Sequence, residues 1–468
     1  MVFSSIVFLF TFLPISLLMY YISPKKFKNA VILLTSLIFY AWGESVYIFL
    51  MVGTIIFDYI MALKIDKYKE DCNKSKKLFI FTLSVNILIL VFFKYFGFIV
   101  DNINNIFSIN IPFSALALPV GISFYTFQVL SYIIDVYLQK VKVQKSIISF
   151  GAYVTMFPQL VAGPIVQYET IEEQLNYREE SLEKFGQGVE RFIQGLGKKI
   201  LLANNIGFVW TTISAMDLGS MSVLTAWIGI IAYTFQIYFD FSAYSDMAIG
   251  LGKMFGFEFI ENFNFPYIST SVTEFWRRWH ISLGSWFREY IYIPLGGNRV
   301  NVGKQIRNIF AVWFLTGLWH GASWNFIVWG LYYGIILLLE KMVFDKVLEK
   351  TPKFIKHVYT MLLVTIGWVF FASTDLTYAI EYIKVMFGLG HNVLIDNAGI
   401  YYLYTNVIMF IILAICSTPI LKNMLDKGVA KSRPLYMNIS LVIHMLVLFL
   451  ATAYLVNETY NPFLYFRF

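Results

Sequence analysis

The chain has 468 residues, of which 58% are hydrophobic and only 14% are charged. A soluble domain would carry about 25% charged residues, so this composition excludes a soluble globular protein. The apolar residues form many runs of membrane-spanning length, which predicts an all-α, polytopic integral protein of the cell membrane. The net charge of +7 lies in short loops between these runs, as the positive-inside rule predicts, and does not indicate a nucleic-acid partner.

The N-terminal part begins with an apolar run, residues 1–20. It has no basic leader and no small-residue cleavage site, so we interpret it as a retained span rather than a signal peptide. Basic loops at residues 23–29 and 64–77 are both expected in the cytoplasm. Because the apolar run between them is too long for one span, two short helices are predicted to turn at the WGES of residues 42–45.

The middle of the chain is less regular. Residues 147–166 contain MFPQLVAGPI, with two prolines and a glycine at membrane depth. Broken backbone is tolerated there only when it is buried in protein or lines a wet cavity. We interpret these residues as a re-entrant segment, and a proline-kinked helix is an alternative that fits them about equally well. Residues 168–184 are acidic and predict a surface helix or loop, and residues 186–210 form an amphipathic, glycine-interrupted stretch.

The remaining crossings follow from apolar length alone. About eleven spans are expected, with re-entrant and amphipathic helices between them, in one domain over residues 1–468 whose motif core is about 235–340. The run at 308–340 is too long for a single plain span. The further predicted crossings are residues 78–100, 113–137, 222–239, 308–340, 359–372, 401–420 and 435–456.

Ionisable residues inside a bilayer are costly and are candidates for functional sites. Three of the five histidines have ordinary interpretations: His357 in a basic loop and His391 beside FGLGHN as surface residues, and His444 as a lone polar group that bonds a neighbouring helix. His280 and His320 differ because each follows a tryptophan in aromatic, apolar sequence. Burial disfavours the imidazolium, and a neutral imidazole can act as a general base on a hydroxyl. The alternative for each is a packed core histidine.

The stretch FWRRWHISLGSWFREYIYIPLGGNR, residues 275–299, concentrates charge in this apolar chain. As one helix it would carry an apolar stripe, Trp276, Trp279, Leu283, Trp286 and Tyr290. Glu274 and Arg278 are spaced to form an i,i+4 pair. Such a helix could lie among lipid headgroups or line a hydrophilic cavity, where Arg277, Arg278 and Arg288 would hold an anionic substrate.

Two aspartates, Asp240 and Asp246, lie in YFDFSAYSDMAIG near membrane depth. Their spacing puts them on different helix faces, so each is expected to pair with an arginine or to bond a hydroxyl. Asp246 is retained as a candidate substrate contact. Cys72 and Cys416 are far apart and, with no other ligand set in the sequence, predict no metal site.

Two long motifs occur in a fixed order, the one at 275–299 and FLTGLWHGASWNFIVWGLYYG at 314–334. Further matching segments are FSSIVFLFTFLPISLLMYY near the start, MFPQLVAGPI, YFDFSAYSDMAIG and the ending NPFLYFRF, so the matching segments are spread along the whole chain. The sequence thereby resembles the membrane-bound O-acyltransferases, and within them the bacterial polysaccharide O-acetyltransferases, as in alginate acetylation. The resemblance implies helices around a central funnel through the membrane.

The same resemblance assigns roles. It implies that His320 is the catalytic histidine and that His280 is a second important histidine in the same cavity. It also implies a cytoplasmic acyl thioester, such as acetyl-CoA, as co-substrate, with no bound cofactor. Since a thioester is already activated, a base and donors to the oxyanion suffice, and Trp319 and Asn325 are candidate donors. Trp279 is a further candidate substrate contact, and the arginines would meet the phosphates of the donor.

The acceptor is expected to be an extracytoplasmic polysaccharide, or an extracytoplasmic acetyltransferase or polysaccharide-processing protein that passes the group on. An acyl carrier protein is a further possible partner. D-alanyl transfer to teichoic acid and O-acetylation of peptidoglycan are alternatives within the resemblance. A secondary transporter or lipid-linked-glycan flippase is the alternative of another class, because broken helices and intramembrane charge are also typical of transporters. A non-catalytic scaffold would leave both Trp-His sites without a purpose.

Overall fold

The computed structural model describes residues 1–113, 116–160, 163–390, 392–431, 433–457 and Leu464. Over these residues the chain is helical and contains no strand, which confirms the predicted all-α class. It divides into two compact units, and we describe each by itself. Unit 1 consists of Met1–Phe192 and Tyr244–Ile260, and unit 2 of Ile193–Ala243 and Glu261–Phe468, so the helices α10 and α12 have residues in both.

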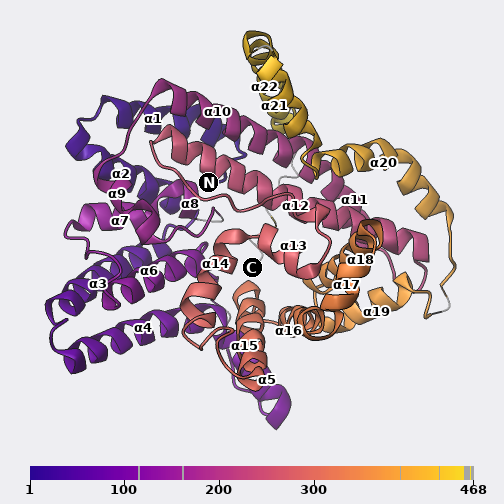
Figure 1. Ribbon diagram of the computed structural model, residues 1–468, viewed down its shortest axis with the longest axis horizontal. Helices are drawn as coiled ribbons and strands as arrows, with labels where there is room; N and C mark the ends of the chain where they lie inside the picture. The colour runs from indigo at the N-terminus through magenta and orange to yellow at the C-terminus, as the bar shows by residue number, and fades with distance from the viewer. Residues whose placement is uncertain (114–115, 161–162, 391, 432, 458–463, 465–468) are drawn as a thin grey trace. The chain divides into compact units, whose positions relative to one another are not determined.

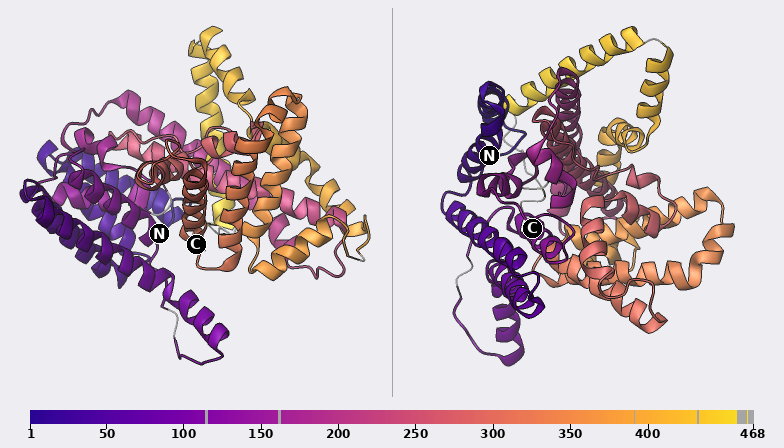
Figure 2. Two further views of the ribbon diagram at one scale, coloured as in Figure 1. Left: turned by 60° about the horizontal axis from the view of Figure 1, so that its bottom comes forward. Right: turned by 60° about the vertical axis from the view of Figure 1, so that its left-hand side comes forward.

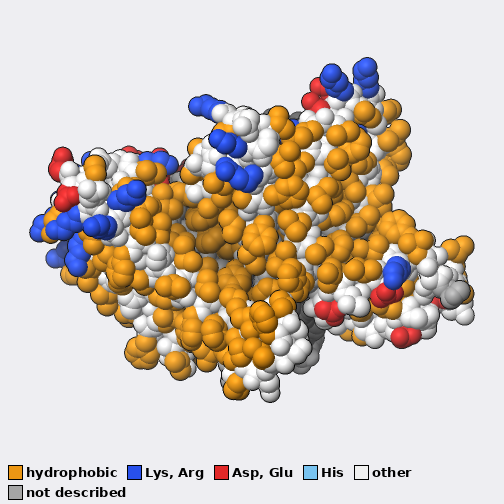
Figure 3. All heavy atoms as spheres, turned by 90° about the horizontal axis from the view of Figure 1, so that it is seen from below, with side chains coloured by type: hydrophobic (Ala, Val, Ile, Leu, Met, Phe, Trp, Pro, Cys, Tyr) orange, Lys and Arg blue, Asp and Glu red, His pale blue; other side chains and the backbone are white. Residues whose placement is uncertain are grey.

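Seven helical stretches among the described residues are long and apolar enough to cross a membrane, and Phe8–Ile22 is a shorter apolar helical run. The polytopic prediction is confirmed, whereas the expected count of about eleven crossings is not. Orange apolar side chains cover most of the face in Figure 3, and the charged side chains form a few separate groups. The seven stretches are Tyr47–Lys67, Cys72–Lys94, Val223–Met254, Trp324–Lys350, Lys353–Ala372, Asn397–Cys416 and Met437–Asn457.

One turn predicted in unit 1 is present. A break between Ala41 and Tyr47 separates two helices at the WGES segment, as expected. The side chain of Asp71 accepts a hydrogen bond from the backbone N–H of Lys74 and so begins α4. The helix α4 packs beside α3 (Figure 2). The elements are η1 (Phe8–Phe12), α1 (Leu13–Ile22), η2 (Lys25–Phe27), α2 (Lys28–Ala41), α3 (Tyr47–Lys67), α4 (Cys72–Lys94), α5 (Phe96–Phe107), α6 (Ile122–Tyr137), α7 (Ile147–Thr155), α8 (Phe157–Leu160), α9 (Tyr168–Asn176) and α10 (Leu182–Gly197).

The proline-containing segment of unit 1 is broken rather than gently kinked. The helix α7 ends at Thr155, Met156 has extended ψ of 108°, and α8 is a single turn that contains Pro158. A proline disfavours helical angles only at the residue directly before it, which is Phe157 here. The break lies instead at Met156, two residues before Pro158. The hydroxyl of Ser36 on α2 accepts the N–H of Phe157, which satisfies a donor that the break releases. The helix is therefore interrupted at Met156, and the re-entrant course of residues 147–166 stays a prediction.

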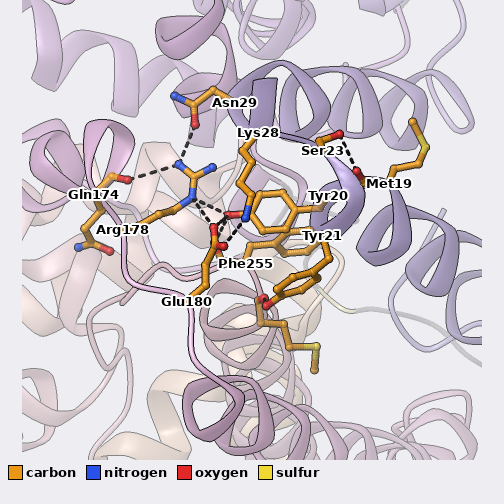
Figure 4. Close-up of polar contacts among 11 residues, drawn as sticks. Met19, Tyr20, Tyr21, Ser23, Lys28, Asn29, Gln174, Arg178, Glu180 and Phe255 are labelled. Atoms are coloured by element: carbon orange, nitrogen blue, oxygen red, sulfur yellow. Dashed lines mark hydrogen bonds and ion pairs between the residues drawn. The ribbon is translucent and has the colours of Figure 1, made fainter. Parts of the chain in front are cut away.

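A partly buried cluster of charge ties three distant parts of unit 1 together (Figure 4). Glu180, in the loop before α10, accepts a hydrogen bond from the Tyr20 hydroxyl at 2.6 Å and forms an ion pair with Lys28 at the start of α2. The Nε of Arg178 donates to the Tyr20 oxygen at 2.6 Å, and its Nη1 donates to Asn29. The Tyr20 hydroxyl oxygen also lies 2.8 Å from the carbonyl oxygen of Phe255, just after α12. The cluster therefore joins residues 20–29, residues 178–180 and Phe255 within this unit.

Unit 2 contains two helices, α15 and α16, that pack unusually closely (Figure 1). A Cβ added to Gly330 would lie 2.2 Å from the carbonyl oxygen of Trp313, and one added to Gly317 would lie 2.4 Å from that of Phe326. Only glycine permits this approach. The elements are η3 (Lys198–Ala203), α11 (Asn204–Ser214), α12 (Val223–Met254), η4 (Pro266–Ile268), α13 (Val272–Arg278), α14 (Ile281–Phe287), η5 (Arg288–Tyr292), α15 (Val302–His320), α16 (Trp324–Leu339), η6 (Glu340–Phe344), α17 (Asp345–Lys350), α18 (Lys353–Ala372), α19 (Leu376–Met386), α20 (Asn397–Cys416), α21 (Ile420–Lys431) and α22 (Arg433–Asn457).

Candidate functional site: two histidines in unit 2

The charged stretch that begins at Phe275 is not one helix, which corrects the sequence prediction. The helix α13 ends at Arg278, and α14 begins at Ile281. Between them His280 has φ of 46° and ψ of 53°, the left-handed region, which costs a non-glycine residue on the order of 1–3 kcal/mol. Four of the five stripe residues are still buried, so apolar burial survives the break. Strained backbone that is held in place by its surroundings is a feature of functional sites.

Asn262 holds the broken backbone in place. Its carbonyl accepts the N–H of Ile281 at 3.0 Å, and its side-chain Oδ1 accepts the N–H of Ser282 at 3.2 Å. The Ser282 hydroxyl donates to the same Oδ1 at 2.9 Å. These bonds replace the helical hydrogen bonds that a continuous helix would make through His280. The interruption therefore depends on a residue from a preceding loop, which a periodicity within 275–299 cannot reveal.

The hydrogen bond between Asn262 and His280 fixes the tautomer of the histidine. The backbone N–H of Ser282 can only donate, so the amide atom that it contacts is the oxygen of Asn262. The Nδ1 of His280 lies 3.2 Å from that oxygen and must carry the proton. In the neutral ring the lone pair then resides on Nε2. His280 is 2% exposed and its ring meets the edge of Phe241 at 4.7 Å.

His320 ends α15 and is 3% exposed. Its ring packs edge-on against Trp329 on α16 at 5.0 Å and against Phe371 on α18 at 5.1 Å. A Cβ on the following Gly321 would lie 2.2 Å from the ring of Phe326, so glycine permits the close approach of this ring. The second histidine therefore lies in a dense aromatic wall formed by three helices.

Trp319 connects the two histidines. Its indole ring lies 5.9 Å from the His280 ring and 4.9 Å from the His320 ring, measured between centroids. The indole is itself buried. Two imidazoles, one from the junction of α13 and α14 and one from the end of α15, are thus brought to one aromatic side chain. The resemblance stated above implied that they share a cavity. Trp279 lies in the same aromatic region, 4.8 Å from Trp368 between ring centroids.

The arginines lie differently from the expectation of a substrate-binding row. Arg278 forms the predicted ion pair with Glu274, at 2.9 Å, and its Nη1 donates to the carbonyl of Asn264. Arg277 and Arg288 are exposed. Within the described residues, no hydrogen bond joins any of the three guanidinium groups to His280 or His320. A role in binding phosphates remains a prediction for Arg277 and Arg288, whereas Arg278 is held by its own helix.

Asn325 is held by the protein rather than presented to a ligand. Its Nδ2 donates to the carbonyls of Phe370 and Ser373, at 3.1 and 2.9 Å, and its Oδ1 contacts the Ser323 hydroxyl. Both N–H groups are used, so an oxyanion-donor role for Asn325 is not supported. The side chain instead ties the start of α16 to the end of α18.

The two aspartates of α12 are both paired, as expected. Asp246, in unit 1, bonds Arg191 on α10 with a shortest distance of 2.6 Å. Asp240, in unit 2, bonds Lys199 of η3 at 2.6 Å, so its partner is a lysine rather than the arginine or hydroxyl that was expected. Each carboxylate is thus occupied by a cation of a neighbouring helix. Neither cation was identified from the sequence, because the pairing becomes visible only when the helices are packed.

Glu340 is another residue that the sequence prediction missed. It is buried, and its two carboxylate oxygens accept the backbone N–H groups of Val272 and Thr273, at 2.7 and 2.8 Å. It also accepts the hydroxyl of Thr273. These donors lie at the N-terminus of α13, so Glu340 caps the helix that leads to His280. In the sequence, Glu340 is only the charged end of an apolar run.

The other histidines lie outside this pair. His357 is not in a loop, which corrects the prediction: it is on α18, and its Nδ1 lies 3.1 Å from the carbonyl oxygen of Ser269. His444 on α22 contacts the Gln194 side chain at 3.0 Å, which confirms a bond to a neighbouring helix. His391 lies outside the described residues. Among the described residues, no group of three or more histidine, cysteine or acidic side chains could hold a metal ion.

A helical, multi-pass membrane protein in which two buried histidines meet at one tryptophan has the features of an enzyme that carries out acid–base chemistry within the membrane. The family model described as MBOAT, membrane-bound O-acyltransferase family, matches residues 34–380, and the chain belongs to that family. It is therefore an O-acyltransferase of the cell membrane.

Relatives cover most of the chain. It is 43% identical over 395 residues to the probable alginate O-acetylase AlgI of Pseudomonas aeruginosa, an alignment that covers 83% of this chain and 75% of the relative. It is 39% identical to the probable alginate O-acetylase AlgI of Pseudomonas putida over the full length of both proteins. It is 36% identical to the peptidoglycan O-acetyltransferase of Helicobacter pylori, with coverage of 83% and 80%.

Proposed function

We propose that this O-acyltransferase moves acetyl groups from a cytoplasmic thioester to an extracytoplasmic polysaccharide, directly or through a partner protein. The observation that carries the proposal is the meeting of His280 and His320 at Trp319, in a chain akin to acetyl-transferring relatives. The named acceptors of these relatives, alginate and peptidoglycan, are both polymers outside the cytoplasm. We propose acetyl-CoA as the donor, and residues 1–468 as one catalytic domain.

His320 serves as the general base in this proposal. Its imidazole takes the proton of the acceptor hydroxyl as the oxygen attacks the thioester carbonyl carbon. The carbon–sulfur bond then breaks, and the departing thiolate receives the proton from the imidazolium. The aromatic wall of Trp319, Trp329 and Phe371 keeps water from the thioester, which would otherwise be hydrolysed. The supporting role belongs to His280, and Arg277 and Arg288 are the candidate contacts to the donor phosphates.

The test is acyl transfer by the purified protein in nanodiscs, with acetyl-CoA labelled in the acetyl group as the probe. His320→Ala is expected to lose more than about 100-fold in acetyl transfer, because a positioned base contributes about 10²–10⁴-fold. The matched control is His444→Ala. Among the described residues, His444 bonds the Gln194 side chain and the preceding turn of its own helix. This variant should transfer acetyl at the wild-type rate.

A transporter would behave differently in sealed vesicles. It would accumulate the labelled substrate inside without breaking the thioester. Neither the wild-type protein nor the His320→Ala variant would then form an acetylated product. Full acetyl transfer by folded His320→Ala would exclude the assigned base while leaving the family membership unchanged. Labelling of isolated cell-surface polymers, with and without the variant, identifies which polymer receives the acetyl group.

A further inference from the structure

The strongest unassigned feature of unit 2 is the amide of Asn262. The residue is 0% exposed, and its Oδ1 accepts three donors: the Nδ1–H of His280, and the N–H and the hydroxyl of Ser282. Among the described residues, nothing accepts a hydrogen bond from its Nδ2. Buried side-chain donors are normally satisfied, and leaving one without a partner costs about 1–3 kcal/mol.

Other buried asparagines in the same chain show how such groups are usually treated. Asn308 is equally buried, and its Nδ2 donates to the carbonyls of Leu295 and Gly297 while its Oδ1 accepts from Arg307. Asn86 uses its Nδ2 for Asp58 and for a carbonyl of its own helix. The open Nδ2 of Asn262 is thus not a general property of asparagines in this protein.

The oxygen and the nitrogen of the Asn262 amide differ in their hydrogen bonding. The oxygen end is saturated by three donors and holds His280 in the tautomer that has its lone pair on Nε2. The nitrogen end presents N–H groups within the same amide plane, beside that imidazole. A ligand that satisfies the nitrogen end must therefore offer an acceptor oxygen. The thioester carbonyl and the acceptor hydroxyl are both groups of that kind.

We propose that Asn262 is a positioning residue for His280 and that its Nδ2 donates a hydrogen bond to an oxygen of the bound substrate. The inference rests on the proposed function, since it identifies a substrate contact of that same site. The oxygen end keeps the imidazole turned so that Nε2 can accept or stabilise a proton. The nitrogen end lowers the energy of negative charge that develops on the carbonyl oxygen, as a preorganised donor does.

The experiment separates the two ends with two variants. Asn262→Asp keeps an oxygen for His280 and Ser282 but loses the Nδ2 donors, whereas Asn262→Leu, of similar volume, loses both ends. We expect Asn262→Asp to lower kcat by about 10-fold or more and Asn262→Leu by about as much as His280→Ala. The KM for acetyl-CoA should change by less than about threefold in both, since a residue that acts on the transition state alters kcat.

A double-mutant cycle supplies the readout that a purely structural role would not give. Because the oxygen end works through His280, adding Asn262→Leu to His280→Ala should cost much less than it does in the wild-type background. Asn308→Asp is the matched control. It removes the same atoms from an equally buried amide, so it should reduce the amount of folded protein without changing the turnover of the molecules that fold.

The outcomes are distinct. Turnover by folded Asn262→Leu within about twofold of wild type overturns the whole inference, and wild-type turnover by Asn262→Asp overturns the substrate contact of Nδ2. Full additivity in the cycle overturns the positioning role. If the wild-type protein itself transfers no acetyl group, the proposed function fails first, and this inference fails with it.

Discussion

Lys199 and Asp240 form an ion pair inside unit 2, with Nζ and Oδ1 2.6 Å apart and each side chain only 3% exposed. The second oxygen of Asp240 accepts the backbone N–H of Leu464 at 2.8 Å, so the carboxylate also anchors a residue near the end of the chain. Charges at membrane depth are retained only when they are paired or needed for function. The next residue, Phe241, packs against His280 and so links this pair to the candidate site.

Removing one member of this pair is expected to be far worse than removing both. Lys199→Met or Asp240→Asn alone leaves a buried partner exposed to an apolar environment, at a cost of about 3–5 kcal/mol. The double variant should recover most of that loss. Melting of the purified protein, followed by size-exclusion fluorescence, measures the effect.

The control for this prediction is the exposed pair of Lys69 and Asp66, in which the side chains are 47% and 37% exposed. Substitution of Lys69 by methionine should leave the melting temperature nearly unchanged, because exposed pairs contribute about 0–1 kcal/mol. Equal melting temperatures for wild type and Asp240→Asn would contradict the importance of the buried pair.

Sequence composition predicted the fold class and the membrane location because both are determined by the apolar environment of the bilayer. Apolar length identified a helical, polytopic membrane protein, and the turn at residues 42–45 followed from the need to place two basic loops on one side. The two Trp-His dipeptides located His280 and His320, since a buried histidine is rare in a sequence of this kind. These inferences depend on single segments and their immediate neighbours.

Features that depend on contacts between distant segments were not predictable in this way. The break at His280 requires Asn262 from the preceding loop, so the heptad-like spacing of tryptophans around it gave a continuous helix. The capping of α13 by Glu340 joins a segment that precedes α15 in the chain to one that follows α16. Asn325, in contrast, had the right chemistry for an oxyanion donor but is occupied by two carbonyls that only the packed helices bring to it.

Glu180 predicts a pH dependence of stability. Burial raises the pKa of this carboxyl, but hydrogen bonds from Lys28 and Tyr20, followed by the charges of Lys28 and Arg178, outweigh burial and hold the pKa below its ordinary value of 4.5. A carboxyl with a depressed pKa in the folded state contributes stability above its ordinary pKa. That contribution is lost as the pH falls through the lower, folded value.

Glu180→Gln is therefore expected to lower the melting temperature at pH 7 and to differ progressively less from wild type as the pH falls from 5 toward 3. Melting curves at several pH values measure the difference. Glu258→Gln serves as the control, because Glu258 pairs with Lys184 while 61% of its side chain is exposed. It should melt as wild type does at pH 7. A difference between wild type and Glu180→Gln that is the same at every pH would contradict the assignment.

Glu340 is expected to control both stability and turnover through α13. Glu340→Ala removes the acceptor of two backbone N–H groups at the start of this helix, which should cost about 1–3 kcal/mol. Since α13 leads directly into the strained backbone of His280, the folded fraction should also turn over more slowly, by about 10-fold. Glu340→Gln does not restore the site, because its amide N–H groups would face donors rather than accept from them.

Glu381→Ala is the matched control for Glu340. That carboxylate belongs to an exposed pair with Lys384 in which both side chains are 49% exposed, so its loss should change neither melting nor turnover. The two measurements, thermal melting and acetyl transfer per folded molecule, separate a helix that no longer forms from one that forms but misplaces His280. Glu340→Ala with wild-type melting and wild-type turnover would show that the N-terminus of α13 needs no acceptor from η6. The capping contact would then have no part in holding the histidine.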